Sequence, residues 1–208
     1  MTINVVVDLS HFNNVTNFNT VKAAGIVGVI HKATQGTDEK DPEYQVRKPQ
    51  ALAAGLWWGA YHFATGGDGT AQAEYFLSTV NPGPTDLLVL DFEQNPGGAS
   101  MTLAEAEQFV THVESVTGRW PGLYGGSYLK ELLGDGQNAT LANCWFWLSE
   151  YGPTPHVPAN WPTWTMWQYT DGQVGPEPYT VEGIGACDRD QFNGDLAGLA
   201  KLWGQTGS

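Results

Sequence analysis

The chain has little positive charge and no long apolar run. Its 9 Lys and Arg stand against 22 Asp and Glu, which gives a formal net charge of −13. Nucleic-acid binding needs a basic surface, and anchoring at an anionic membrane needs a basic cluster, so the composition argues against both. No apolar stretch approaches the length that spans a bilayer. We therefore expect neither a nucleic-acid partner nor membrane insertion.

Cysteine is also scarce. Two residues, Cys144 and Cys187, are too few for a disulfide framework and lack the spacing of a metal site. Both fall in apolar segments predicted as strands. If a third strand separates those two, the Cα atoms lie about 9–10 Å apart, which is too far for a disulfide. The sequence predicts two buried free thiols, no bound metal and no cofactor.

Several catalytic signatures are missing. There is no Gly-x-Ser-x-Gly turn of an α/β-hydrolase, no His-Glu-x-x-His zinc motif and no phosphate-binding glycine loop. The first residues, Met1 to Asn4, lead directly into an apolar strand without the basic and apolar segments of a signal peptide. We expect synthesis in the cytoplasm, unless a leader has been removed.

The chain contains enough apolar residues to form one large domain. Of its 208 residues, 41% are hydrophobic and 15% are charged, so it can bury a core. Nine tryptophans are present, of which most should lie in the core and some could form flat platforms for sugar rings. No repeat or linker interrupts the sequence. We predict a single domain over residues 1–208.

The first 125 residues alternate between apolar strands and helical segments. The predicted strands are 4–8, 27–32, 56–63, 87–93 and 121–125, and the predicted helices are 21–25, 42–54, 71–79 and one starting at the capping box of Thr102 and Glu105. This alternation favours a parallel sheet with right-handed crossovers. The remainder contains strands 145–149, 163–169 and 185–190, and one helix, 196–202. The expected fold is α/β, a reduced TIM-like barrel with five βα units followed by three strands with few helices.

Two carboxylates follow the most apolar strand. Leu87 to Leu90 lead into Asp91, Phe92 and Glu93. Residues i and i+2 of a strand share a face, so Asp91 and Glu93 should point the same way from Cα atoms about 6–7 Å apart. Carboxylates this close allow one of them to keep a proton near neutral pH, as a general acid must. The alternative is a strand that simply ends in a polar loop.

Acids end two further predicted strands. Asp8 ends the first strand, and Asp188 and Asp190 end the last. In a parallel barrel the carboxyl ends of the strands meet at one mouth, so we expect these acids to converge there. Other candidate site residues near strand ends are Lys32, Tyr61, Tyr124, Trp167 and Gln168. Aromatic side chains beside acids suit a groove that cleaves carbohydrate, although such acids could instead bind Mg²⁺ or Ca²⁺.

Seven motifs then resemble glycoside hydrolase family 25, the Chalaropsis-type lysozymes. They run in order over residues 3–194 and are Asp8-Leu9-Ser10, Lys32 to Gly36, Gly59 to Phe63, Leu90 to Glu93, Leu123-Tyr124, Trp167 to Tyr169 and Asp188 to Phe192. The sequence departs from the family pattern at Asn13, where Gln is frequent, and at Asp190, where Asn is common. These departures concern loop contacts and substrate preference.

The resemblance implies a β/α barrel that hydrolyses the β-1,4 bond between N-acetylmuramic acid and N-acetylglucosamine. Glu93 falls at the proton donor, and Asp91 at the carboxylate that orients the substrate's 2-acetamido group. Attack by an enzyme nucleophile stays open as the alternative. Asp8 and Asp188 are expected to hydrogen-bond and to keep Glu93 protonated. The remaining candidates, Tyr61, Tyr124, Trp167, Lys32 and Gln168, are expected to bind substrate.

The expected partner is the glycan strand of bacterial peptidoglycan, bound by a monomer. The resemblance and the apparent lack of a signal peptide suggest a phage endolysin that reaches the wall through another protein's membrane lesion. A secreted bacterial autolysin is the alternative origin. The alternative function is a non-catalytic glycan-binding module on the same barrel, although the presence of all four site acids favours the enzyme.

Overall fold

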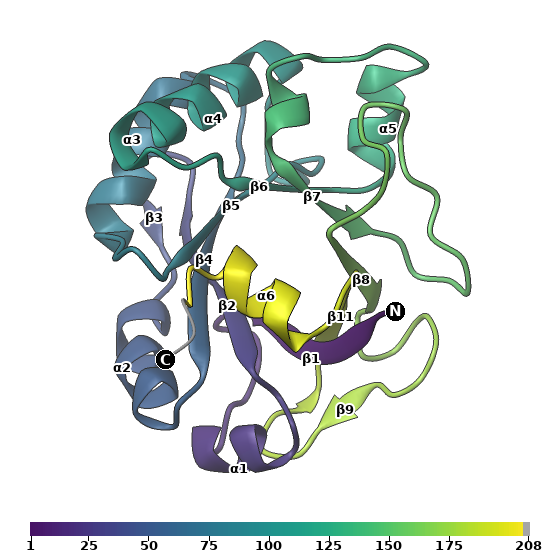
Figure 1. Cartoon of the computed structure of the whole chain (residues 1–208). Helices are drawn as coiled ribbons and strands as arrows, with labels where there is room; N and C mark the ends of the chain where they lie inside the picture. Colours follow the sequence, from purple (N-terminus) through teal and green to yellow (C-terminus); the bar gives the residue numbers. More distant parts are fainter. Residues whose placement is uncertain (206–208) are drawn as a thin grey trace.

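The chain forms a closed barrel of eight strands. The computed structural model describes residues 1–205, so the last three residues of the expected domain lie outside the description. The barrel strands are β1 (Ile3–Leu9), β2 (Gly28–Gln35), β4 (Trp57–Phe63), β5 (Leu87–Asp91), β6 (Gly122–Gly125), β7 (Trp145–Ser149), β8 (Met166–Thr170) and β11 (Asp188–Phe192). They are ordered β1-β11-β8-β7-β6-β5-β4-β2, and pairing of β1 with β2 closes the ring (Figure 1). The predicted barrel is confirmed.

Seven of these strands are parallel, and the last is not. Strands β1, β2, β4, β5, β6, β7 and β8 run in one direction. Strand β11 is antiparallel to both of its neighbours, β1 and β8. The expected strand 185–190 is therefore wrong in extent, since Gly185–Ala186 (β10) pairs with Thr180–Val181 (β9) in a separate ribbon. Asp188 begins β11 instead of lying near the end of a strand.

Helices on the outside complete five βα units. The helices are α1 (Phe18–Ala23), α2 (Tyr44–Ala53), α3 (Gly69–Val80), α4 (Leu103–Thr117), α5 (Ser127–Leu133) and α6 (Leu196–Leu202), with a 3₁₀ turn at Leu141–Asn143 and a short strand β3 (Glu39–Lys40) paired to the end of β2. The capping box of Thr102 and Glu105 starts α4 as expected. Helix α5 was not expected, because it has only 7 residues and no capping side chain.

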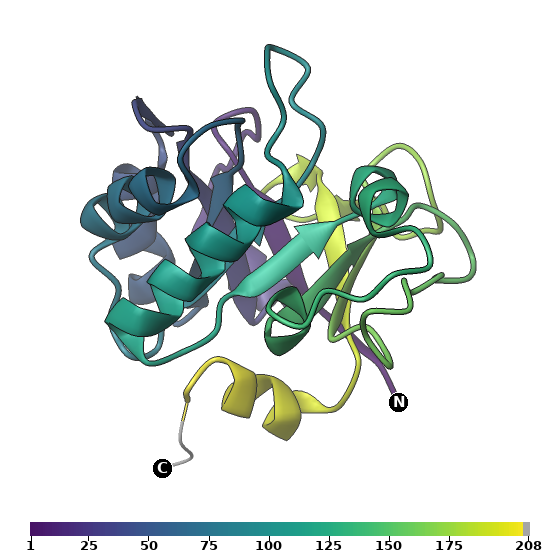
Figure 2. The same cartoon turned by 90° about the horizontal axis from the view of Figure 1, so that it is seen from above.

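Helix α6 covers one end of the barrel. It lies across the barrel in Figure 1, and in Figure 2 it lies at the end opposite the loops that follow the parallel strands. Just after it, Trp203 is fully buried and donates a hydrogen bond from Nε1 to the Trp58 carbonyl oxygen at 2.9 Å. A Cβ on Gly28 would lie 2.7 Å from the Trp203 ring, so this close approach requires glycine. Helix α6 and Trp203 thus cover the end of the barrel where the parallel strands begin (Figure 2).

Both cysteines are buried and free, which confirms the predicted thiols. They lie beside strands and not within them: Cys144 precedes β7, and Cys187 lies between β10 and β11. Among residues 1–205, no helix combines the length and apolar character needed to cross a membrane.

Candidate active site

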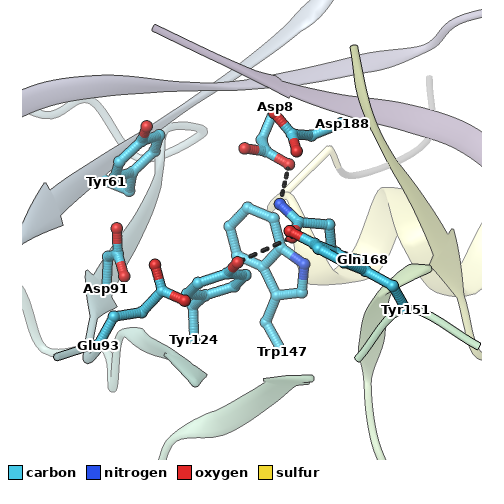
Figure 3. Close-up of a pocket in the computed structure, with 9 residues that line it drawn as sticks. All are labelled: Asp8, Tyr61, Asp91, Glu93, Tyr124, Trp147, Tyr151, Gln168 and Asp188. Atoms are coloured by element: carbon cyan, nitrogen blue, oxygen red, sulfur yellow. Dashed lines mark hydrogen bonds between the residues drawn. The ribbon is translucent and has the colours of Figure 1, made fainter. Parts of the chain in front are cut away.

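A cavity of about 180 Å³ opens at the carboxyl ends of the parallel strands. Figure 3 shows its lining, which is Asp8, Tyr61, Asp91, Glu93, Tyr124, Trp147, Tyr151, Gln168 and Asp188. Four carboxyl groups from three separate stretches of chain therefore meet in one hollow. The reversal of β11 makes this possible, because it brings the beginning of that strand to the mouth, where Asp188 pairs with Asp8.

Asp91 and Glu93 enter the cavity from the same side. Asp91 is the last residue of β5, and Glu93 lies beyond the strand. Between them Phe92 is buried, stacks on Tyr128 and donates its backbone N–H to the Tyr124 carbonyl oxygen at 2.9 Å. The alternation of side chains thus continues past the end of the strand, and both carboxyl groups point into the hollow (Figure 3).

The acids of the cavity favour their protonated forms. Burial raises the pKa of Asp91 well above its usual range, and the charge of Glu93 adds to this while Lys32 opposes it. Burial, followed by the charge of Asp188, raises the pKa of Glu93. Burial raises the pKa of Asp188 to about 6. Like charges this close cannot all ionise together, so the site retains protons near neutral pH.

Gln168 is oriented by two tyrosines. The hydroxyls of Tyr124 and Tyr151 donate to its Oε1 at 2.8 and 2.9 Å. An amide oxygen accepts and the amide nitrogen donates, so these contacts turn Nε2 towards Asp8, whose Oδ2 it reaches at 2.7 Å. One carboxylate oxygen of Asp8 is therefore already occupied, and Asp8 is held in place by a chain of hydrogen bonds from side chains of two strands and a loop.

Two of the expected substrate-binding residues lie outside the cavity lining. Trp167 precedes Gln168 on β8 and faces the other way, with Nε1 donating to the Glu150 carbonyl oxygen at 2.7 Å. Lys32 donates to Gln35 Oε1 at 2.6 Å and lies over the Phe63 ring. Lys32 still acts on the site at a distance, since its charge lowers the pKa of Asp91.

Sequence reasoning missed two lining residues, Trp147 and Tyr151. Trp147 stands opposite Tyr124 in the register of β6 and β7, and the two rings meet edge to face. The alternation in Trp145-Phe146-Trp147 shows that one face carries both tryptophans but not which face is inside. Tyr151 lies in the loop after β7, where no periodicity indicates direction.

The alternative of a cation held by these acids has no support in the geometry. Among residues 1–205, no group of three or more His, Cys, Asp or Glu side chains is arranged to hold a metal ion. What the arrangement offers instead is a set of acids in unequal environments, with aromatic rings beside them. That combination suits acid–base chemistry on a sugar.

Comparison with known proteins identifies the family. The profile of the Glycosyl hydrolases family 25 matches residues 7–177. The chain belongs to this family. Lysozyme M1 of Streptomyces globisporus is 34% identical over 216 residues, which cover 96% of this chain and 71% of that protein. An N,O-diacetylmuramidase of Chalaropsis sp is 31% identical over 94% of this chain and 96% of its own.

Solved structures agree with this assignment. The bacterial lysozyme from Streptomyces coelicolor superposes with a TM-score of 0.84 at 35% identity, covering 97% of both chains. A family GH25 lysozyme from Aspergillus fumigatus gives a TM-score of 0.83 at 30% identity, covering 97% of this chain and 99% of its own. The expected family, its barrel and its class of enzyme, a glycosidase, are therefore confirmed.

Proposed function

We propose that this chain hydrolyses the β-1,4 bond between N-acetylmuramic acid and N-acetylglucosamine in bacterial peptidoglycan. The observation that carries the proposal is the single cavity in which Glu93, Asp91, Asp8 and Asp188 meet beside tyrosine and tryptophan rings. Family membership makes the chain a glycosidase, and relatives named lysozyme and N,O-diacetylmuramidase support the choice of bond.

Glu93 is the proton donor in this proposal. It is partly buried, and burial together with the nearby Asp188 raises its pKa, so the acid form persists towards neutral pH. As the bond to the leaving sugar breaks, the Glu93 proton passes to the glycosidic oxygen. The resulting carboxylate then takes a proton from the water that completes hydrolysis, which returns Glu93 to its starting state.

Asp91 positions the group that attacks. Its Oδ1 is buried and receives no hydrogen bond from the described residues. An unoccupied acceptor beside the proton donor suits the N–H of a substrate 2-acetamido group, and that contact would turn the acetamido oxygen towards the sugar carbon. The acetamido oxygen bonds to that carbon as the glycosidic bond breaks, and water later displaces it, so the configuration is retained.

Asp8 and Asp188 act on charge and position. Their backbones pair across β1 and β11, and both carboxyl groups line the cavity opposite Glu93 (Figure 3). The charge of Asp188 favours the protonated form of Glu93, and both carboxyl groups stabilise positive charge that develops at the sugar carbon. Tyr61 and Tyr124 supply walls for the sugar.

The direct test is digestion of purified peptidoglycan, followed by mass spectrometry of the fragments and an assay of their reducing ends. Fragments that end in reducing N-acetylmuramic acid support the proposal. Fragments that end in reducing N-acetylglucosamine would keep the acid chemistry and move the cleavage to the other bond. A lack of fragments from several wall types would refute the proposed activity.

The domain and the route to the wall are further proposals. We propose that residues 1–208 act as one catalytic domain and as a monomer, which light scattering after size-exclusion chromatography measures directly. For the route we propose release from the cytoplasm through a membrane lesion, as a phage endolysin is released, with a secreted autolysin as the alternative. Expression in a bacterial cytoplasm tests the proposed route: lysis should wait for chemical permeabilisation of the membrane, and lysis without it would contradict release through a lesion.

A further inference from the structure

One fully buried acid below the cavity has no part in the proposed reaction. Asp190 has 0% of its surface exposed and does not line the cavity. On the neighbouring strands it lies opposite Val6 of β1 and Gln168 of β8. Val6 belongs to the apolar interior of the barrel, so Asp190 lies where that interior meets the acids of the mouth.

The hydrogen bonds of Asp190 do not suit a full negative charge. Trp147 Nε1 donates to Oδ1 at 2.8 Å, but Oδ2 is buried and receives no N–H or hydroxyl hydrogen bond from the described residues. Arg189, the next residue of β11, donates instead to the Thr180 carbonyl oxygen and to Asn4 Oδ1. A buried carboxylate without a charged partner is costly, and the usual response is to bind a proton.

Asp8 lies two residues beyond Val6 on the same face of β1, so its carboxyl group is a diagonal neighbour of Asp190 across the paired strands β1 and β11. Burial raises the pKa of Asp190 well above its usual range, and the charge of Asp188 adds to this. Hydrogen bonds with the Trp147 and Asp8 side chains and the charge of Arg189 lower the pKa but do not outweigh burial. The charge of Asp190 in turn raises the pKa of Asp8. The charged and titratable groups around Asp190 are Asp8 from β1, Asp188 and Arg189 from β11, Tyr169 from β8, and Cys187.

We propose that Asp8 and Asp190 share one proton, so that the pair carries a single negative charge and Asp190 acts as a positioning residue for Asp8. The proton belongs to the pair and not to either residue alone. Asp8 is then held from one side by Gln168 and from the other by Asp190, while Asp190 also holds the Trp147 indole at the cavity wall. The effect on turnover rests on the proposed function, whereas the shared proton does not.

The proposal predicts how stability depends on pH. The unfolded chain releases the proton near the ordinary Asp pKa of about 3.9, but the folded pair keeps it to higher pH. Above about pH 4 the folded state therefore binds more protons than the unfolded state, and stability falls as pH rises until the pair ionises. Asp190→Asn removes this loss, because its amide accepts from Trp147, donates to Asp8 and does not titrate.

The experiment is thermal unfolding of the wild type and of Asp190→Asn between pH 4 and pH 8, followed by circular dichroism. The difference in Tm between Asp190→Asn and the wild type should increase by roughly 3–5 °C for each unit by which the pH is raised, as long as the pair keeps its proton. A difference in Tm that does not change with pH would overturn the proposal, because a purely structural role gives a constant offset.

A matched control and an independent readout make the result specific. In Asp41, burial would raise the pKa, but hydrogen bonds from His11 and Glu43 lower it, so Asp41 is ionised in the folded and the unfolded chain above the ordinary Asp pKa of about 3.9. The Tm of Asp41→Asn should therefore differ from that of the wild type by a nearly constant amount between about pH 5 and pH 8. Infrared difference spectra of wild type against Asp190→Asn at pH 7 should show the loss of one protonated-carboxyl band. Spectra that lose only carboxylate bands would refute the shared proton, whatever the activity of either protein on peptidoglycan.

Discussion

Replacing Glu93 by Gln removes the proton donor of the proposed reaction and keeps the size of the side chain. General acid catalysis contributes about 10²- to 10⁴-fold, so kcat on peptidoglycan should fall by that factor, equivalent to about 3–5 kcal/mol of barrier. Binding to the wall should persist, because the cavity keeps its shape. The change also removes a charge that raises the pKa of Asp91, so any residual activity should extend to lower pH.

The nature of the leaving group provides a sharper form of this test. The sugar hydroxyl released from a peptidoglycan strand needs a proton as it departs, whereas an activated phenol departs readily as its anion. Rates on an aryl glycoside with a highly activated phenol should therefore fall much less in Glu93→Gln than rates on peptidoglycan. Equal losses on both substrates would point to a disturbed site and not to a missing acid.

The matched control is Glu74→Gln, which makes the same chemical change at an exposed position of α3, outside the cavity. Lysis of purified walls and wall binding are measured for the wild type and both variants. Glu74→Gln should behave as the wild type does. If Glu93→Gln lyses walls at the rate of Glu74→Gln, the assignment of Glu93 as proton donor is wrong.

Three other changes have expected outcomes. Activity should decline on the alkaline side of the pH–rate profile as Glu93 loses its proton. Asp188→Asn should move this alkaline limb to lower pH, because removing the Asp188 charge lowers the pKa of Glu93. Tyr151→Phe removes one of two hydroxyls that orient Gln168 and should lower kcat/KM about fivefold, as loss of about 1 kcal/mol implies. Gly28→Ala forces a Cβ against the indole ring at the closed end of the barrel, which should cost about 1–3 kcal/mol in denaturant unfolding and leave kcat/KM unchanged.

The sequence was most informative where apolar runs end in acids. The apolar run Leu87 to Leu90, bounded by turn residues, favoured a buried strand and so placed Asp91 at a strand end. The alternation of strands and helices implied that several such ends meet. Strand direction was harder to predict. The long segment between β8 and β11, residues 171–187, allows either direction for the final strand, and only the pairing with β1 and β8 decides it.

The phase of alternation was not predictable in strands buried on both faces. In β8 every residue is buried, so hydrophobicity does not show whether Trp167 or Gln168 faces inward. An apolar ring and an amide both suit a sugar site, but only one of two adjacent strand residues can point into the barrel. The same ambiguity explains why Trp147 was not predicted as a lining residue. Helix α5 was not predicted for a different reason: it is short and has no side chain that caps its first turn.

The reversal of β11 explains why two acids only two residues apart behave differently. Along an antiparallel strand the chain runs from the mouth inward, so Asp188 lies at the mouth opposite Asp8, and Asp190 lies one layer deeper opposite Val6. A parallel strand of the same sequence would reverse that order. The two positions should therefore separate in experiment: Asp188→Asn should change the pH profile of turnover, and Asp190→Asn the pH profile of stability. If both variants changed the same profile in the same way, the two carboxyl groups would form one titrating unit, and the layered arrangement proposed for the mouth would be wrong.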